Sequence, residues 1–393
     1  MKVCFITCHY PPLSRTYRRY CFARYLADEG CDLEVVTHGN ISRALGSFVD
    51  DPDTVVDDPR IAVHRPRAVP WHLTGEVLYR AGLIACPHLN WRRPAARAAA
   101  GIARSSAEVV LGVYPPLTNL IAAWDVSRRT GARLVVDFRD EYLGLARGPR
   151  RRLAARWQAR LLRDAHLVSV ATPALARQFA DRDGLAEGRL HVTENGYFDD
   201  PGEPPVRAPG ESLRLVYAGA ISAIQGVDVL CRAMEVLRTR NPAAAARVQA
   251  VIYGPDNLYR RTVLEPALVP GVIYGGYLRA GEVSTQLHGA DACFLSLSSS
   301  AYSYAVPGKL YEYIAHGRPV LAALPAGAAQ ELIEREGFGL VAPCGSAEGL
   351  ASQIEAMIRP AIREPMLAAL RAGRQRYGAE PNFRSLARRI RSL

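Results

Sequence analysis

Short, nearly continuous apolar runs alternate with longer helix-like segments along the whole chain of 393 residues. Such runs, in place of strict alternation between apolar and polar positions, are typical of strands that helices cover on both faces. The candidate strands are KVCFIT, DLEVVT, IAVH, EVVLGV, RLVVDF, HLVSVA and LHVT, followed by LRLVYA, VQAVIY, GVIYGG, ACFLSL, PVLAAL and GLVAP. Because the alternation occurs twice, we predict an α/β fold of two Rossmann-like, doubly wound parallel sheets.

One segment interrupts this pattern between the two halves. Residues 197–212, YFDDPGEPPVRAPGES, are rich in Pro, Gly and acidic residues and poor in large apolar ones, as is typical of a linker. We therefore predict an amino-terminal domain over 1–200, a linker over 201–212 and a carboxy-terminal domain over 213–393, with a last helix able to cross back. Two such domains are expected to face each other across a ligand cleft at the carboxyl ends of their strands.

A short helix after Pro307 carries the strongest chemical signal. Pro307 and Gly308 suit its start, and Lys309 and Glu312 lie one turn apart near its amino terminus, where free N–H groups favour anions. The helical spacing places His316 on the same face. Lys309 is one of only two lysines, against 47 arginines. A surface ion pair could use arginine equally well, whereas a compact phosphate site distinguishes the two cations. We interpret the pair as a nucleotide site, with the ammonium at a diphosphate and the carboxylate at a ribose diol.

Composition and residue spacing narrow the possible partners, the location and the metal requirement of the protein. The net charge of +11 indicates an anionic partner, but no nucleic-acid motif is present and we expect no nucleic-acid partner. The eight cysteines are scattered and mostly in apolar runs, which favours a reducing, cytoplasmic location. No apolar run is long enough to span a membrane. The histidines have no metal-ligand spacing, and Asp51-x-Asp53 lies in an acidic loop, so we assign no metal.

Several motifs together resemble the GT-B glycosyltransferases, specifically the retaining, metal-independent family 4 type. The resemblance covers nearly the whole chain. It rests on HYPP with the helix after it, VVDFRDEY at 135–142, ENGYFDD at 194–200, YAGAISAIQGVDVLCRAM at 217–234 and PGKLYEYIAHGRPVLA at 307–322. The fold class that this implies is GT-B, with acceptor binding in the first domain and nucleotide-sugar binding in the second.

The resemblance also implies roles for individual residues of the second domain. Glu312 would bind the ribose and Lys309 the diphosphate, with Gly308 bringing the helix terminus close to the phosphate. The remaining donor-site candidates are Gly219, Ser222 and Gln225 along the phosphates and Tyr277 or Leu278 near the base. Relatives often carry Arg and Lys in the 219–226 loop, where this chain has Ala220 and Gln225. Lys309, alone or together with Arg15, would therefore neutralise the departing diphosphate.

In the first domain the resemblance implies an acceptor side. Its candidates are Arg139 and Asp140 at the end of VVDF, together with an acceptor or phosphate loop made of Ser14, Arg15, Thr16 and Tyr114. Lys309, Arg139 and Asp140 are the expected catalytic residues. Asp140 would orient the acceptor hydroxyl, and Arg139 would meet a donor phosphate or an acidic acceptor.

The expected function is transfer of a sugar from a nucleotide sugar to an acceptor hydroxyl, with retention of configuration and without a cofactor. The acceptor would be a carbohydrate, a lipid-linked precursor or a small molecule, in surface-polysaccharide or natural-product biosynthesis. UDP, GDP, dTDP and ADP sugars all remain open as donors. A nucleotide-sugar 2-epimerase and a non-catalytic nucleotide-sugar-binding subunit are the alternatives. The Arg-rich segment 147–164 predicts either an exposed basic helix or peripheral contact with the inner membrane face.

Overall fold

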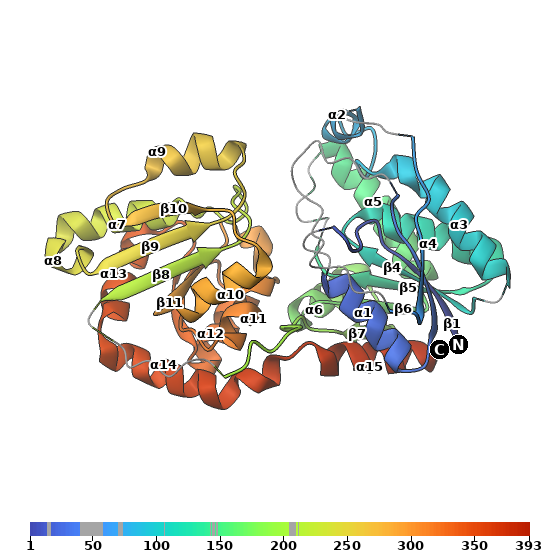
Figure 1. Ribbon diagram of the computed structural model, residues 1–393. Coiled ribbons are helices and arrows are strands. Elements are labelled where there is room, and N and C mark those ends of the chain that lie inside the picture. The colour runs from blue at the N-terminus through green and yellow to red at the C-terminus, as the bar shows by residue number, and fades with distance from the viewer. Residues whose placement is uncertain are drawn as a thin grey trace. The chain divides into compact units, whose positions relative to one another are not determined.

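The chain forms two compact units in the computed structural model, shown in Figure 1. The first unit comprises 1–194 and 380–393, and the second comprises 195–379. The passage from one unit to the other thus comes a few residues before the segment that we predicted as a linker. The structure describes residues 1–13, 17–39, 58–69, 74–105, 107–141, 143, 146, 148–203, 210 and 212–393.

The first unit is built on a sheet of seven parallel strands in the order β3-β2-β1-β4-β5-β6-β7. All seven apolar runs predicted in this half form its strands. Burial follows the pattern: five of the six residues of β5 and all four of β6 are buried. The strands are β1 (Lys2–Ile6), β2 (Asp32–Val36), β3 (Ile61–His64), β4 (Val109–Tyr114), β5 (Arg133–Phe138), β6 (Leu167–Val170) and β7 (Leu190–Val192).

Helices connect these strands and cover the sheet. Local signals fix several of their ends: the Thr172 hydroxyl accepts a hydrogen bond from the Leu175 N–H at the start of α6, and Gly131 ends α4 in a left-handed conformation. The helices are α1 (Tyr17–Asp28), α2 (Thr74–Arg80), α3 (Arg92–Ser105), α4 (Leu117–Thr130), α5 (Gly148–Asp164) and α6 (Pro173–Asp183).

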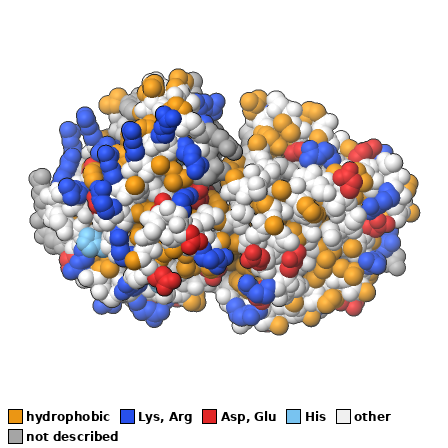
Figure 2. Space-filling model, turned by 180° about the vertical axis from the view of Figure 1, so that it is seen from behind, with side chains coloured by type: hydrophobic (Ala, Val, Ile, Leu, Met, Phe, Trp, Pro, Cys, Tyr) orange, Lys and Arg blue, Asp and Glu red, His pale blue; other side chains and the backbone are white. Residues whose placement is uncertain are grey.

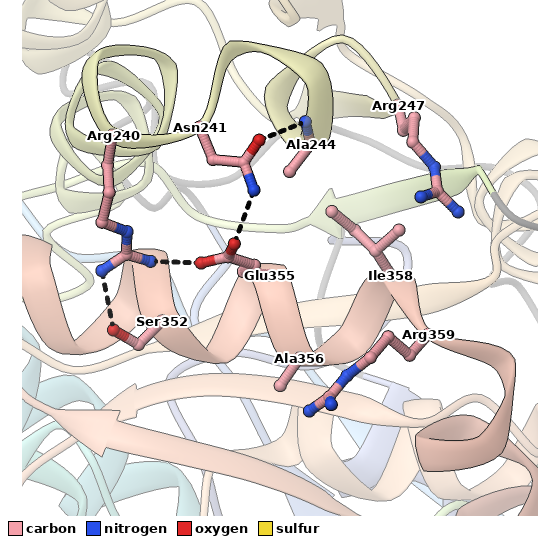
Figure 3. A pocket seen from close by; sticks show the side chains of 9 residues that line it. All are labelled: Arg240, Asn241, Ala244, Arg247, Ser352, Glu355, Ala356, Ile358 and Arg359. Carbon is pink, nitrogen blue, oxygen red and sulfur yellow. Dashed lines mark hydrogen bonds and ion pairs between the residues drawn. The ribbon is translucent and has the colours of Figure 1, made fainter.

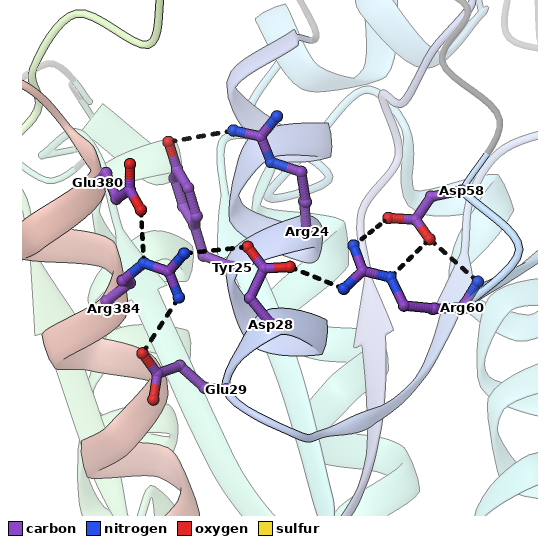
Figure 4. A network of polar contacts seen from close by, with 8 residues as sticks. All are labelled: Arg24, Tyr25, Asp28, Glu29, Asp58, Arg60, Glu380 and Arg384. Carbon is purple, nitrogen blue, oxygen red and sulfur yellow. Dashed lines mark hydrogen bonds and ion pairs between the residues drawn. The ribbon is translucent and has the colours of Figure 1, made fainter.

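The last helix, α15 (Glu380–Arg391), belongs to the first unit, although the second unit precedes it in the chain. Phe383 of α15 is buried and packs edge-on against Phe22 of α1. Arg384 adds ion pairs to Asp28 and Glu29 at the end of α1, at 3.2 and 3.4 Å (Figure 4). Apolar packing, with ion pairs at its edge, therefore holds the end of the chain on the first unit.

The second unit has six parallel strands in the order β10-β9-β8-β11-β12-β13. Again every predicted run forms a strand, so the predicted fold class is confirmed. The strands are β8 (Leu213–Ala218), β9 (Val248–Tyr253), β10 (Val272–Gly276), β11 (Ala292–Ser296), β12 (Val320–Leu324) and β13 (Gly339–Pro343). The helices are α7 (Val229–Arg240), α8 (Pro242–Ala245), α9 (Glu265–Ala267), α10 (Ala280–His288), α11 (Gly308–Ala315), α12 (Ala328–Glu336), α13 (Ala347–Ile358) and α14 (Pro360–Gly373).

Two apolar cores lie on the opposite faces of this second sheet. Successive residues of β8 point to opposite faces: Leu215 and Tyr217 pack with residues of α7 and α13, and Val216 packs with residues of α10, α11 and α12. Both faces of the second sheet are thus buried under helices, which explains the continuous apolar runs of the sequence. None of the helices in the described part of the chain combines the length and the apolar character that a membrane span needs.

Candidate active site

The amino terminus of α11 is the centre of the candidate site. Pro307 is the N-cap residue in an extended conformation, and the helix runs from Gly308 to Ala315, as predicted. Leu310 and Ile314 are fully buried and anchor the helix on the sheet. Lys309 is half-buried and Glu312 is exposed. The first N–H groups of a helix have no intrahelical acceptor, so Lys309 lies where a helix already favours an anion.

The ammonium group of Lys309 is held against Tyr217 on β8. Its Nζ donates a hydrogen bond to the Tyr217 hydroxyl and lies 3.8 Å from the centroid of the Tyr217 ring. That hydroxyl in turn donates to the carbonyl of Ala220. A cation over an aromatic ring is stabilised electrostatically, so Tyr217 orders the lysine above the carboxyl end of β8. Sequence analysis did not select Tyr217; its position at the end of a strand, two residues before a glycine, was the available signal.

Gly219 makes room for the same lysine. Its φ of +146° lies in the region that favours glycine, and a Cβ added there would lie 2.4 Å from Lys309 Cε and 2.9 Å from Nζ. The Gly219 N–H donates to the carbonyl of Tyr253 at 3.0 Å, which fixes the start of the loop on β9. A side chain at 219 would both strain the backbone and displace the ammonium group. The structure therefore brings the predicted residues Gly219 and Lys309 into contact.

The rest of the 219–226 loop is tied by its own hydrogen bonds. The Ser222 hydroxyl donates to the Gln225 side-chain oxygen at 2.6 Å and accepts from the Ile224 N–H at 3.2 Å. Ser298, after β11, donates to the carbonyl of Ala223 at 2.6 Å. Ser222 and Gln225 thus hold the shape of the loop beside Lys309, and their predicted contact with donor phosphates stays a prediction.

The predicted base-binding residues follow β10. Tyr277 is 53% exposed and Leu278 is half-buried. The Glu282 carboxylate accepts a hydrogen bond from the Arg279 N–H at 2.7 Å and thereby fixes the turn into α10. An exposed aromatic ring and an aliphatic side chain on an ordered turn are suited to stacking on a base, and this role also stays a prediction.

The helix differs from the sequence-based expectation at its carboxyl end, where His316 lies. The spacing placed His316 on the same face as Lys309 and Glu312, but the residue comes after the last helical turn and is buried. Its Nε2 lies 2.9 Å from the Ser284 hydroxyl, and its ring packs against His288. Burial lowers its pKa, so the ring packs as a neutral group.

Arg139 and Asp140 lie at the carboxyl end of β5, in the first unit. Arg139 donates to both carboxylate oxygens of Asp137, at 2.6 and 2.8 Å, and to the Thr193 carbonyl at 2.8 Å. The Arg139 and Asp137 side chains are only 6% and 1% exposed. Removing one member of such a buried pair typically lowers the stability of the folded protein by about 3–5 kcal/mol. The arrangement favours a positioning role of Arg139 over the predicted contact with substrate.

Asp140 is half-buried, and its carboxylate accepts a hydrogen bond from the Glu141 N–H at 3.2 Å. Tyr114, at the end of the neighbouring strand β4, is also half-buried, and its carbonyl accepts from the Arg139 N–H at 3.2 Å. Both predicted residues therefore lie at the same end of adjacent strands. Ser14, Arg15 and Thr16 lie outside the described residues, as do Asp51 and Asp53.

A hollow of about 520 Å³ lies elsewhere in the second unit, apart from the residues described so far (Figure 3). It lies beside Arg247, which precedes β9, and is therefore near the amino-terminal ends of the strands. One of its arginines, Arg240, is bonded to Glu355 at 2.7 Å and to Ser352 at 3.1 Å. Ligands of doubly wound sheets bind at the opposite end, so this hollow is separate from the candidate site around Lys309.

The two doubly wound units, each a parallel sheet flanked by helices, match the GT-B class of glycosyltransferases. The comparison with family models agrees. Residues 18–196 match the model described as "Glycosyl transferase 4-like domain", and residues 212–359 match "Glycosyl transferases group 1". The chain therefore belongs to the family 4 type of glycosyltransferases, which use a nucleotide-sugar donor. No curated protein sequence matches the chain.

Several solved structures share the fold over nearly the whole length. HepE of Anabaena, in complex with UDP-glucose, is 16% identical, with a TM-score of 0.70 and coverage of 100% of both chains. A glycosyltransferase of Rickettsia africae is 13% identical, with a TM-score of 0.68 and coverage of 99% and 97%. WaaG, a glycosyltransferase involved in lipopolysaccharide biosynthesis, is 14% identical, with a TM-score of 0.66 and coverage of 98% of both. At these identities the likeness establishes the fold alone.

Proposed function

We propose that this glycosyltransferase transfers a sugar with retention of configuration and without a metal ion. The observation that carries the proposal is the Lys309 ammonium, held by Tyr217 and accommodated by Gly219 at the amino terminus of α11. During transfer, negative charge builds on the departing nucleoside diphosphate. A fixed ammonium and helix N–H groups stabilise that charge without a metal ion.

In the proposed step, the bond between the sugar C1 and the diphosphate oxygen breaks while the acceptor oxygen bonds to C1 on the same face. The acceptor proton passes to an oxygen of the departing phosphate, so no protein base is required. Lys309 stabilises the leaving group, Glu312 binds the ribose hydroxyls, and Asp140 orients the acceptor. We propose Arg139 as a positioning residue, because its hydrogen bonds to Asp137 and Thr193 order the strand end that carries Asp140.

The first experiment is a thermal-shift panel of UDP-glucose with GDP, dTDP and ADP sugars. A ligand that binds only the native state raises its stability, and the UDP-glucose complex of HepE makes that donor the first to try. Incubation of the binding donor alone separates the alternatives. A transferase gives slow hydrolysis to sugar and nucleoside diphosphate, a 2-epimerase gives a new sugar nucleotide, and a non-catalytic subunit gives neither product.

Glu312→Ala is expected to raise the dissociation constant of the donor about tenfold to hundredfold. A hydrogen bond to a charged group contributes about 1.5–3 kcal/mol, which corresponds to that range. Calorimetric titration of the nucleoside diphosphate measures the effect. Glu331→Ala is the matched control, because Glu331 is an exposed carboxylate in the first turn of a neighbouring helix, α12. Equal affinities of the Glu312 variant and the wild type would remove the ribose assignment.

We also propose that α5 contacts an anionic membrane surface. Its exposed arginines include Arg152 and Arg156, and Figure 2 shows Lys and Arg side chains gathered on the first unit when it is viewed from behind. The neighbouring α2 segment, linked to α5 by the stacking of Arg150 on Tyr79, adds two exposed aliphatic side chains, Val77 at 61% and Leu83 at 68%. Basic and aliphatic side chains together favour an anionic bilayer interface.

Replacing both Arg152 and Arg156 by glutamate is expected to weaken sedimentation with vesicles that contain phosphatidylglycerol by about tenfold or more. Each basic residue near such a surface contributes about 1 kcal/mol, and reversal of the charge adds repulsion. The same change of charge at the exposed residues Arg371 of α14 and Arg388 of α15 is the control. Equal sedimentation of both double variants would identify α5 as an ordinary arginine-rich surface helix.

A further inference from the structure

The topological switch point of the first sheet lies between β1 and β4. Its strand order, β3-β2-β1-β4-β5-β6-β7, proceeds from β1 toward one edge and from β4 toward the other. In doubly wound sheets, ligands bind outside the carboxyl ends of the strands at this point. The segment Cys8–His9 after β1, Pro115 after β4 and the first turn of α1 border the region.

Arg19, in the first turn of α1, reaches into this region. Its Nη2 donates to the Pro115 carbonyl at 2.8 Å, whereas its Nε is buried and has no hydrogen-bond partner. Burial lowers the pKa of the guanidinium to about 10, and no ion pair involves it within the described part of the chain. Asp137, whose charge also acts on Arg19, is already engaged by Arg139.

Among the described groups around Arg19, the negative charge comes from Asp137, which Arg139 already engages. Burial holds the pKa of His9 well below its usual value and raises that of the Cys8 thiol, so both side chains are neutral at pH 7. The first turn of α1 contains no acidic residue, and its N–H groups add to the positive potential. A half-buried cation whose Nε is buried without a hydrogen-bond partner is costly unless an anion completes the site.

We propose that Arg19 binds an oxyanion of the acceptor, either a phosphate or a carboxylate group. The proposal rests on the proposed transfer function and specifies the class of acceptor: a sugar or lipid-linked sugar that carries a negative charge close to the hydroxyl to be glycosylated. A planar guanidinium is suited to bidentate binding of both groups. Sequence analysis overlooked Arg19 because it is one of 47 arginines, and the resemblance gives it no role although it lies in the helix after HYPP.

The test compares three probes on the full chain: glucose 6-phosphate, glucuronate and neutral glucose, each titrated calorimetrically in the presence of the nucleoside diphosphate. At least one charged sugar is expected to bind about tenfold or more tightly than glucose, and the phosphate and carboxylate probes show which oxyanion is preferred. Arg19→Gln is expected to abolish the difference. Arg24→Gln, on the same helix, is the control and is expected to retain it.

Two outcomes would overturn the proposal: equal binding of the three sugars to the wild type, or an undiminished preference for charged sugars in Arg19→Gln. The comparison on the wild type requires no variant to fold, and thermal unfolding of Arg19→Gln checks its integrity. Donor hydrolysis, measured separately, reports the transfer function. If no sugar nucleotide binds, the proposed function fails, whereas the three-probe comparison made without nucleotide still decides whether Arg19 binds an oxyanion.

Discussion

Lys309→Ala is expected to lower the kcat for sugar transfer about 10²–10³-fold, with a smaller change in the affinity for the donor. Removing one preorganised donor that stabilises developing charge typically costs about 2.7–4 kcal/mol of transition-state stabilisation. The Lys309 ammonium meets that description, because its hydrogen bond to Tyr217 and its contact with the ring hold it in place before the donor binds. Steady-state rates with the donor identified in the thermal-shift panel measure the loss.

Two further lysine variants sharpen this test. Lys2→Ala removes the other lysine of the chain, which pairs with Glu34 at 2.8 Å in the first unit, and is expected to leave kcat unchanged. Lys309→Arg keeps the charge but replaces a compact ammonium by a broad planar group beside Gly219, and is expected to lose most of the rate. A fully active Lys309→Arg variant would refute a site shaped for lysine, and a fully active Lys309→Ala variant would refute the site itself.

The fold could be predicted from sequence because its signals are local and repeated. Each of the predicted apolar runs forms a strand, because a strand that helices cover on both faces consists almost entirely of apolar residues. Pro307 likewise gave the start of α11. His316 was misplaced because helical periodicity was extended past Ala315, where the helix ends and tertiary packing against His288 decides the orientation of the ring.

The site was only partly predictable, for the opposite reason. Lys309 and Glu312 are close in sequence, so their spacing revealed them. The support for Lys309 comes from Tyr217 and Gly219, about ninety residues earlier, and only the fold brings these residues together. Arg139 and Arg19 show the same limit. No sequence pattern indicates that Asp137 engages the guanidinium of Arg139, or that the Nε of Arg19 has no hydrogen-bond partner.

Gly219→Ala is expected to reduce kcat to nearly the same extent as Lys309→Ala, although it leaves the lysine in the chain. The added Cβ would lie 2.4 Å from Lys309 Cε, and the φ of +146° is one that alanine rarely adopts. The ammonium must then leave its position at Tyr217, and the strained backbone costs about 1–3 kcal/mol of stability. Transfer rates and thermal unfolding, measured together, separate the two effects.

Gly337→Ala is the matched control, because Gly337 also has a positive φ, of +66°, but its Cβ would meet only Ala369 Cβ at an ordinary 3.9 Å. It is expected to lose stability and keep the rate per folded molecule. The double variant Gly219→Ala/Lys309→Ala decides the mechanism. If Gly219 acts by making room for the ammonium, the double variant is no slower than Lys309→Ala alone, because residues that act as a unit have non-additive effects. Fully additive losses would mean that Gly219 serves the donor independently of Lys309.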